Sequence, residues 1–370
     1  MRLSNVLHLG VKELRSLSRD PLLFALILFA FTVSVYTAAT AMPETLHEVP
    51  IAIVDEDQSP LSGRIAGAFY PPYFQPPTLI AHSEMDPRLD AGLDTFALVI
   101  PPEFQRDLLA GRRPQLQLNV DATRVSQAFT GSGYVQAIVS GEVEEFLRRH
   151  RAGAAAPVEL ALRNRFNPAL RQGWFGAIAE VVSNVTMIAI ILAGAALIRE
   201  REHGTIEHLL VMPVTPAEIM VSKIWAMGLV VFVAVAFSLT VVVEGWLGVP
   251  VAGSIGLFLL GAALHIFACT TLGIFLATVA RSMPQFGLLL ILTMLPMQTL
   301  SGGMTPRESM PELVQQLMLV APTTHYIALS EAILFRGAEF SMVWPQLLAL
   351  VVIGVALFLL SLGQFRKSLA

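Results

Sequence analysis

Long apolar segments are the feature that most constrains how this chain can fold. Residues 22–42 contain no charged side chain. Segments of similar character follow at 172–198, 224–246, 254–279, 286–304 and 343–363. A helix needs about 20 predominantly apolar residues to cross the hydrocarbon core of a bilayer, and each segment is close to that length or longer. We therefore predict an α-helical integral membrane protein with six transmembrane helices.

Charged residues gather between the first two of these segments. They make up 14% of the 370-residue chain, in which hydrophobic residues make up 54%. An average soluble domain carries about 25% charged residues. Residues 43–171 nevertheless hold 12 arginines and 16 acidic residues, more than half of all the charged residues. This contrast predicts one large water-exposed domain inserted between the first two membrane-spanning helices.

The inserted domain alternates strand-like and helix-like stretches. Short apolar runs predict strands at 49–55, 78–82, 95–101 and 115–121. Helical patterns lie between and after them, at 59–69, 102–110 and 124–150. We therefore predict a small α/β extracytoplasmic domain.

An acidic triplet follows the first predicted strand. Asp55, Glu56 and Asp57 have the side chains of a metal site or of a catalytic carboxylate pair. Acidic residues at this kind of position more often form a turn and cap the next helix. We therefore favour a structural role for the triplet.

Several classes of function are excluded by residue types. The chain has three lysines, Lys12, Lys223 and Lys367, and none follows a glycine, so a GxxxxGK[ST] phosphate-binding loop is absent from the sequence. Its one cysteine, Cys269, excludes an internal disulfide framework and any multi-cysteine metal site. The net charge of −4 gives no indication of a nucleic-acid-binding surface.

Lysine and arginine are divided unevenly between two sets of short segments. Ten of them lie in segments 1–21, 199–223, 280–285 and 364–370. The alternate segments, 247–253 and 305–342, have only Arg307 and Arg336. Because short loops rich in Lys and Arg stay in the cytoplasm, we predict that both termini are cytoplasmic and that residues 43–171 face outward.

The first 21 residues have a helical pattern of their own. One face carries Leu3, Leu7, Gly10, Leu14 and Leu17. Basic residues occupy the rest, which predicts an amphipathic helix at the membrane interface with basic side chains near lipid headgroups. The alternative is a cleaved signal peptide ending near residues 39–41. It is disfavoured because the uncharged run is longer than the roughly 7–15 residues of a signal-peptide core.

Residues 199–223, between the second and third spans, contain a series of local signals. Gly204 interrupts the second span, Thr205 can cap a short helix over 206–212, and Pro213 ends that helix. A capping box then starts the third span, with the residues Thr215, Pro216 and Glu218.

The short helix predicted between the two spans has an apolar face. Its apolar residues are Leu209, Leu210 and Met212. Its rim contains Glu202, His203, Glu207 and His208. Such a helix is suited to fit a groove on a partner protein. The alternative is a helix that lies on the membrane surface.

The same segment resembles the signature of ABC-2 type transport permeases. It contains Glu-Arg-Glu at 200–202, Gly-Thr at 204–205, Glu-x-Leu-Leu at 207–210, Pro213 and a second short motif ending in Lys223. Similar stretches lie at 12–21, 51–59, 120–134, 280–285, 300–311 and 322–326. The resemblance therefore covers essentially the whole chain, and it is to the bacterial inner-membrane members of the family.

The resemblance implies the membrane half of an ATP-driven exporter, working as a dimer with a second copy or a paralogue. A separate ABC ATPase subunit would bind ATP and Mg²⁺, and this chain would bind no cofactor. Segment 199–223 would contain the coupling helix that contacts the ATPase. The residues expected at this contact are Arg201, Glu202, Gly204, Thr205, Glu207, Leu209, Leu210, Pro213, Thr215 and Glu218.

Two further features belong to the same resemblance. Residues 305–342 would form re-entrant helices in the outer leaflet. A periplasmic membrane-fusion adaptor is a further partner that the resemblance allows, and it would dock on the extracytoplasmic domain.

Polar residues inside the spans are candidates for lining a transport path, because a charged side chain at the bilayer centre costs about 2.5–3.5 kcal/mol on insertion scales. We predict this role for Glu180, Asn184, Gln298 and Thr299. The alternative for each is a hydrogen bond between helices. The expected cargo is hydrophobic or amphiphilic, either drug-like or a lipid.

Two functions from other classes are kept as alternatives. A non-transporting membrane sensor would bind a ligand in its outer domain, although six spans with re-entrant helices are more than a sensor needs. An intramembrane hydrolase would need paired catalytic groups at one depth, and His265 has no acidic residue within its span.

Overall fold

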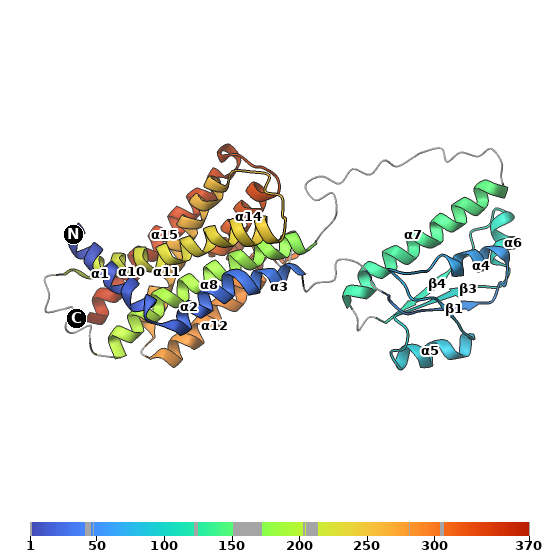
Figure 1. Cartoon of the computed structure of the whole chain (residues 1–370), viewed down its shortest axis with the longest axis horizontal. Helices are drawn as coiled ribbons and strands as arrows, with labels where there is room; N and C mark the ends of the chain where they lie inside the picture. The colour runs from blue at the N-terminus through green and yellow to red at the C-terminus, as the bar shows by residue number, and fades with distance from the viewer. Residues whose placement is uncertain are drawn as a thin grey trace. The chain divides into compact units, whose positions relative to one another are not determined.

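The chain folds into two compact units. The computed structural model describes residues 2–40, 46, 48–121, 125–150, 172–202, 204, 214–280, 282–303 and 307–369. One unit, here called the helix bundle, combines Met1–Met42 with Arg163–Ala370. The other, here called the α/β unit, is Pro43–Leu162 (Figure 1). Each unit is described by itself.

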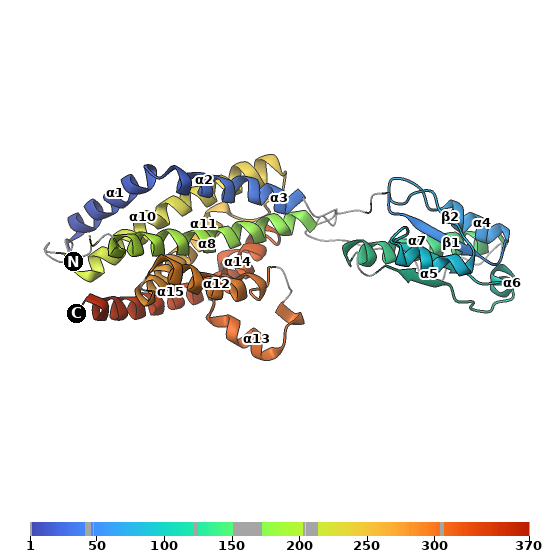
Figure 2. The ribbon, with the colours of Figure 1, turned by 90° about the horizontal axis from the view of Figure 1, so that it is seen from below.

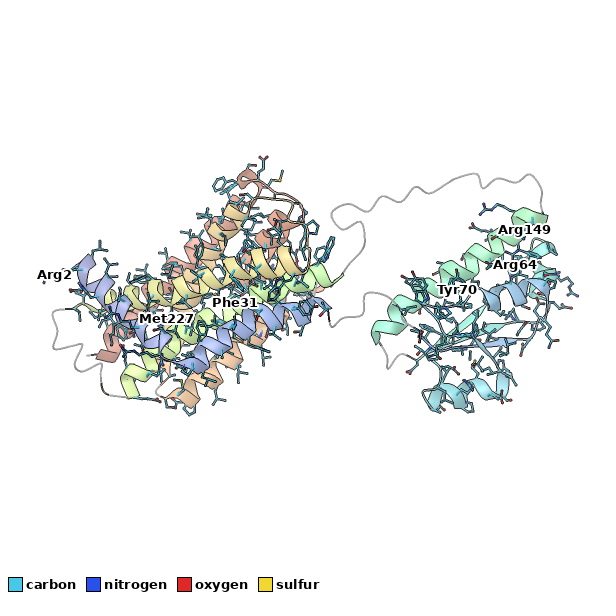
Figure 3. The ribbon with its side chains drawn as sticks, viewed as in Figure 1. Arg2, Phe31, Arg64, Tyr70, Arg149 and Met227 are labelled. Atoms are coloured by element: carbon cyan, nitrogen blue, oxygen red, sulfur yellow. The ribbon has the colours of Figure 1, made fainter. Side chains whose placement is uncertain are left out.

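The helix bundle is built from long apolar helices around α8 (Gln172–Glu202), the most buried of the candidate spans. Before α8 come α1 (Leu3–Ser18), α2 (Pro21–Phe29), the π-helical turn η1 (Ala30–Ser34) and α3 (Val35–Thr40). After it come α10 (Pro216–Phe237), its π-helical continuation η2 (Ser238–Trp246), α11 (Ile255–Val279), α12 (Met283–Thr299), η3 (Arg307–Ser309), α13 (Glu312–Leu317), η4 (Met318–Val320), α14 (Pro322–Leu334) and α15 (Phe340–Leu369). The bundle core includes Phe31 and Met227, which are labelled in Figure 3.

Five helices of the described residues are long and apolar enough to cross a membrane. They are Pro21–Thr40, Gly173–Glu202, Pro216–Trp246, Ile255–Val279 and Phe340–Lys367. The fifth predicted span, 286–304, corresponds to α12, which has 17 residues and ends at Thr299. That length is at the lower limit of the roughly 17–25 residues of a membrane-spanning helix.

The segment after α12 contains a bent pair of helices. The stretch Glu312–Val320 meets Pro322–Leu334 at 95°. Pro322 begins α14, and a proline there favours a break because it cannot continue the preceding helix. The first helix of the pair, α13, stands out from the bundle and has no buried residue (Figure 2). Together the pair has the geometry of a broken span or of a re-entrant loop.

The face of α1 that packs against the bundle includes part of the predicted apolar face. Its buried residues include Gly10 and Leu17, but Leu3 and Leu7 are exposed. The cause is the indole of Trp225 in α10. A Cβ atom on Gly10 would lie 2.1 Å from this ring, so the glycine lets the two helices approach closely. Leu3 and Leu7 stay outside the bundle, and the membrane-interface role of this helix stays a prediction.

The α/β unit contains a four-stranded sheet with the order β2-β1-β3-β4. Its strands are β1 (Ile51–Asp55), β2 (Thr78–Leu79), β3 (Phe96–Ile100) and β4 (Gln117–Val120). Strand β1 is parallel to both β2 and β3, whereas β4 is antiparallel to β3. The stretch predicted as a strand at 78–82 is mostly not one. Its end enters helix α5 (His82–Asp90), because the Glu84 carboxylate accepts a hydrogen bond from the backbone N–H of Ala81 and caps that helix.

Both faces of this sheet are covered by helices. Ile51 and Ile53 of β1 belong to a core shared with α4 (Pro60–Gly67) and α7 (Val125–His150). Ala52 and Val54 point to the opposite face, where α5 packs. This period of two is what a strand buried on both sides requires. The short helix α6 (Phe104–Leu109) contributes Phe104 to the first of the two cores.

An ion pair joins the two helices on the first face. Arg64 of α4 donates to Glu142 of α7 at 2.8 Å (Figure 3 labels Arg64). This hydrogen bond raises the pKa of the guanidinium, which therefore remains charged.

A glycine sets the contact between α8 and α11. A Cβ atom on Gly273 would lie 2.3 Å from the carbonyl oxygen of Ile190, whereas one on Gly287 of α12 would meet no atom within 4 Å. We predict that Gly273→Ala lowers the free energy of unfolding in detergent by about 1–3 kcal/mol through overpacking. Gly287→Ala is the matched control, because it gives the same gain in helix propensity without the clash. Equal stability of the two variants would contradict this prediction.

Candidate functional site

Four charged side chains form a cluster at the end of the helix bundle that carries both termini (Figure 1). This charge cluster consists of Lys12 and Glu13 from α1, Glu200 from α8 and Lys223 from α10. Lys223 Nζ lies 2.8 Å from Glu13 Oε1 and 2.8 Å from Glu200 Oε2, and Lys12 Nζ lies 3.0 Å from Glu200 Oε1. The cluster thus joins three helices with balanced charge.

Three of the four charged side chains are buried, so their ion pairs strongly constrain how the three helices pack. The Lys223 side chain is 2% exposed, and those of Glu13 and Glu200 are 9% and 10% exposed. Buried charges are tolerated when they are paired, and removing one partner then becomes costly. We conclude that the charge cluster fixes α1 against the end of α8 and the start of α10.

The last turn of α8 also holds the ends of two other helices. The Arg201 guanidinium donates to the carbonyl of Ala280, 2.8 Å away, just past the end of α11. The Glu202 carboxylate accepts from the backbone N–H of Met283, 2.9 Å away, at the first residue of α12. A cation at a helix C-terminus and an anion at an N-terminus both complement the helix dipole. The end of α8 is therefore tied to the end of α11 and to the start of α12.

The start of α10 is a capping box, as the sequence predicts. The Thr215 hydroxyl accepts from the Glu218 N–H at 3.3 Å, and the Glu218 carboxylate accepts from the Thr215 N–H at 2.8 Å. Glu218 also accepts from the backbone N–H of Arg2, which brings the N-terminus to the same place. Because the Glu218 side chain is buried, its observed role is to position α10 and α1.

The segment between α8 and α10 includes most of the predicted coupling residues. Gly204 is described, with φ +68, and its N–H donates to the carbonyl of Arg201. The other predicted residues in this segment lie outside the described residues; they are Thr205, Glu207, Leu209, Leu210 and Pro213. The contact of this segment with a partner stays a prediction.

A cavity of about 360 Å³ lies in the half of the bundle away from the termini. Its walls come from α3, α8, α12, α14 and the chain after α12. Two of the predicted path residues, Glu180 and Gln298, line it. The Gln298 amide donates to the Ser183 hydroxyl at 2.6 Å, which links α12 to α8 across the wall.

The other two predicted path residues, Asn184 and Thr299, form hydrogen bonds inside the helix bundle. Asn184 is buried, and its amide donates to the carbonyl of Ala30 at 2.7 Å and to Glu180 at 3.2 Å. The Thr299 hydroxyl donates to the carbonyl of Leu295 in its own helix. Neither is among the residues that line the cavity. For Asn184 the structure therefore shows the contact between helices that was the alternative.

His265 belongs to a buried polar group next to the cavity. One ring nitrogen lies 2.8 Å from the Thr186 hydroxyl, and the ring stacks on Tyr326 with centroids 4.5 Å apart. Cys269 lies beside it, with 3.4 Å between sulfur and nitrogen. No acidic side chain takes part in the contacts that the structure gives for this histidine. The arrangement is that of a core histidine with its hydrogen bond satisfied.

The acidic triplet of the α/β unit has the contacts of a turn. Asp55 accepts hydrogen bonds from the N–H groups of Asp57 and Gln58 and from the Ser62 hydroxyl. Asp57 accepts from the N–H of Gln105. Within the described part of the chain, no group of three or more His, Cys, Asp or Glu side chains is placed to hold a metal ion.

Sequence reasoning missed several residues of both sites. Glu13 is in the charge cluster, and Ser301 and Thr323 line the cavity. One signal was available for Glu13, since it falls on the same helical face as Gly10 and Leu17 and must therefore be buried with them. Ser301 and Thr323 carry no comparable signal, because hydroxyl residues are common in transmembrane helices.

Comparison with known proteins agrees with a bundle of membrane-spanning helices. The model of the "ABC-2 family transporter protein" family matches residues 21–362. The chain is 59% identical over 367 residues to the inner membrane transport permease YhhJ of Escherichia coli K12, covering 99% of this chain and 98% of that one. It is 27% identical over 364 residues to the probable multidrug ABC transporter permease YbhR of the same strain, covering 96% of each chain. With these matches and its apolar helices, the chain belongs to the ABC-2 family of transport permeases and is a multi-pass membrane protein.

Proposed function

We propose that this chain is the membrane-spanning permease subunit of an ATP-driven exporter. It moves a hydrophobic or amphiphilic molecule out of the cytoplasm or the inner membrane, and a separate ABC ATPase subunit binds ATP and Mg²⁺ and hydrolyses the nucleotide. The observation that carries the proposal is that α8 extends from Glu202, beside the predicted coupling segment, to Glu180 in the cavity wall. The helix between these two residues has about 22 residues at about 1.5 Å each, so a single helix of about 33 Å connects the predicted coupling segment with the cavity.

The contacts at the end of α8 support a way to couple the two sites. Force on segment 203–215 reaches α1 and α10 through the charge cluster, and it reaches α11 and α12 through Arg201 and Glu202. Helix α12 carries Gln298, Met294 and Met297 into the cavity wall. Displacement of α8 and α12 changes the shape of the cavity. A cargo with different affinity for the two shapes is then moved.

The remaining parts of the proposal concern orientation and assembly. Both termini and segment 203–215 lie in the cytoplasm, and the α/β unit lies in the periplasm, as the Lys and Arg bias of the short loops supports. The working unit is a dimer with a second copy or a paralogue. A periplasmic membrane-fusion adaptor docks on the α/β unit.

Co-purification with an ATPase subunit tests this function directly. We expect the full chain, expressed together with an ABC ATPase subunit from the same genome, to purify as a stable complex. In liposomes, the ATPase activity of this complex should rise when cargo is added, which a non-transporting sensor would not show. Failure of the two subunits to associate, or an ATPase rate indifferent to every amphiphile tested, would refute the exporter function.

A further inference from the structure

The cavity in the helix bundle is mostly apolar but contains a carboxylate. Its apolar wall includes Phe175, Met294, Met297 and Ile327, and Glu180 is the one acidic side chain among its lining residues. An unpaired carboxylate in an apolar site is costly unless another group compensates its charge. The partners of Glu180 therefore decide what the cavity accepts.

The two carboxylate oxygens of Glu180 differ in their surroundings. The Ser34 hydroxyl donates to Oε1 at 2.5 Å, and the Asn184 amide donates to the same oxygen at 3.2 Å. Both donors are neutral, so they orient the carboxylate without cancelling its charge. Among the described residues, no Lys, Arg or His forms an ion pair with Glu180. The hydrogen bonds given for the described residues leave the second oxygen, Oε2, without a donor.

Two hydroxyl groups in the same wall also lack partners. Ser301 Oγ and Thr323 Oγ1 are buried without a hydrogen bond, and both residues are 2% exposed. Buried hydroxyl groups are nearly always bonded to protein, water or ligand. Both residues line the cavity. The wall thus offers one negative charge to an occupant, whereas the two hydroxyl oxygens have almost no accessible surface.

We propose that this cavity binds an amphiphilic organic cation, with Glu180 as its counter-ion. The cationic centre lies against the Glu180 carboxylate, and the apolar part contacts the aromatic and methionine side chains. Aromatic faces attract cations, and methionine side chains adapt to varied shapes. The volume of about 360 Å³ falls within the usual range for small-molecule sites. An anion is repelled, and a neutral hydrophobe leaves the carboxylate uncompensated. The proposal deepens the proposed function, on which it rests, by naming the class of cargo.

A matched pair of probes tests the charge requirement. Methyltriphenylphosphonium is cationic, and methyltriphenylsilane is its neutral counterpart of nearly the same shape. Binding is measured to the full chain in nanodiscs of zwitterionic phosphatidylcholine. We expect Glu180→Gln to weaken phosphonium binding about tenfold or more and to leave silane binding as strong or stronger; tenfold corresponds to about 1.4 kcal/mol. Glu244→Gln is the control, because Glu244 is exposed and is not among the residues that line the cavity.

A second measurement uses the unaltered chain, so it does not depend on the variant folding. Dicyclohexylcarbodiimide is a hydrophobic reagent for carboxyl groups, and we expect it to label the peptide that contains Glu180. The phosphonium should protect this peptide, and the silane should not. Equal phosphonium affinity of wild type and Glu180→Gln, absence of saturable phosphonium binding, or equal protection by both probes would each overturn the proposal.

These measurements need neither ATP nor a partner, which separates the two hypotheses. Phosphonium binding through Glu180 in a chain that never associates with an ATPase would support the cation site and remove the exporter function. A complex whose ATPase rate responds to neutral amphiphiles, together with failure of the tests above, would remove only the cation site.

Discussion

Replacing Lys223 with methionine should strongly destabilise the end of the helix bundle that carries both termini. The substitution keeps a long unbranched side chain but removes the cation that Glu13 and Glu200 share. Removing one partner of a buried ion pair costs about 3–5 kcal/mol, because the remaining charge stays desolvated. We expect the free energy of unfolding, measured by chemical denaturation in detergent, to fall by about this amount. Association with the ATPase should be lost with it.

Lys12→Met provides a matched control from the same cluster. The Lys12 side chain is 53% exposed and also pairs with Glu200. An exposed ion pair contributes about 0–1 kcal/mol, so this variant should remain close to wild type. Adding Glu13→Gln to Lys223→Met should restore part of the stability, since it removes one of the uncompensated charges. A Lys223→Met protein as stable as Lys12→Met would show that the cluster does not hold the helices together.

Structural elements that depend on residues close together in the sequence could be predicted from the sequence. The capping box at Thr215 and Glu218 depends on residues three positions apart, and the structure shows it. Strands β1 and β3 were expected because of their apolar runs, and they lie in the middle of the sheet. The apolar spans follow in the same way from length and hydropathy. In each of these cases the determining interaction is local.

Contacts between distant residues could not be predicted in this way. Glu13 and Lys223 are 210 positions apart, and nothing near either residue indicates that they meet. The buried face of α1 depends on Trp225 fitting over Gly10, which the pattern of leucines in α1 alone does not indicate. A helix has several partly apolar faces, and the partner determines which is buried.

Only part of the candidate cavity could be predicted, because its side chains also meet partners that are distant in the sequence. Glu180 and Gln298 were chosen because polar side chains are rare in spans, and both line the cavity. Their partners Ser34 and Ser183, and the hydroxyls of Ser301 and Thr323, have no distinctive pattern in the sequence. Most hydroxyl residues in these helices donate to a carbonyl of their own helix, as Thr299 does. The unpartnered ones can be recognised only in three dimensions.

Gly204→Pro should abolish ATP-driven transport while leaving the fold intact. Gly204 has φ +68, and its N–H donates to the carbonyl of Arg201 at 3.1 Å. Proline holds φ near about −65° and has no N–H, so the chain must leave α8 in another direction. A Cβ atom at this position would meet nothing within 4 Å, so the bundle itself should lose little stability. We expect transport by the permease–ATPase complex in liposomes to fall more than about tenfold, a ratio that corresponds to about 1.4 kcal/mol.

Two milder substitutions distinguish the effect of a changed chain direction after α8 from the effect of losing the glycine itself. Gly204→Asn should retain most transport, because asparagine enters the left-handed region more readily than other residues. Gly204→Ala should be intermediate, since a left-handed alanine costs roughly 1–2 kcal/mol. The predicted order of activity is therefore glycine, asparagine, alanine and proline, with unfolding free energies that differ by no more than roughly 1–2 kcal/mol across the series. Because the bundle is unchanged in all four proteins, this order would locate the effect in the direction of the segment after α8. Full transport by Gly204→Pro would show instead that the path of this segment does not control coupling.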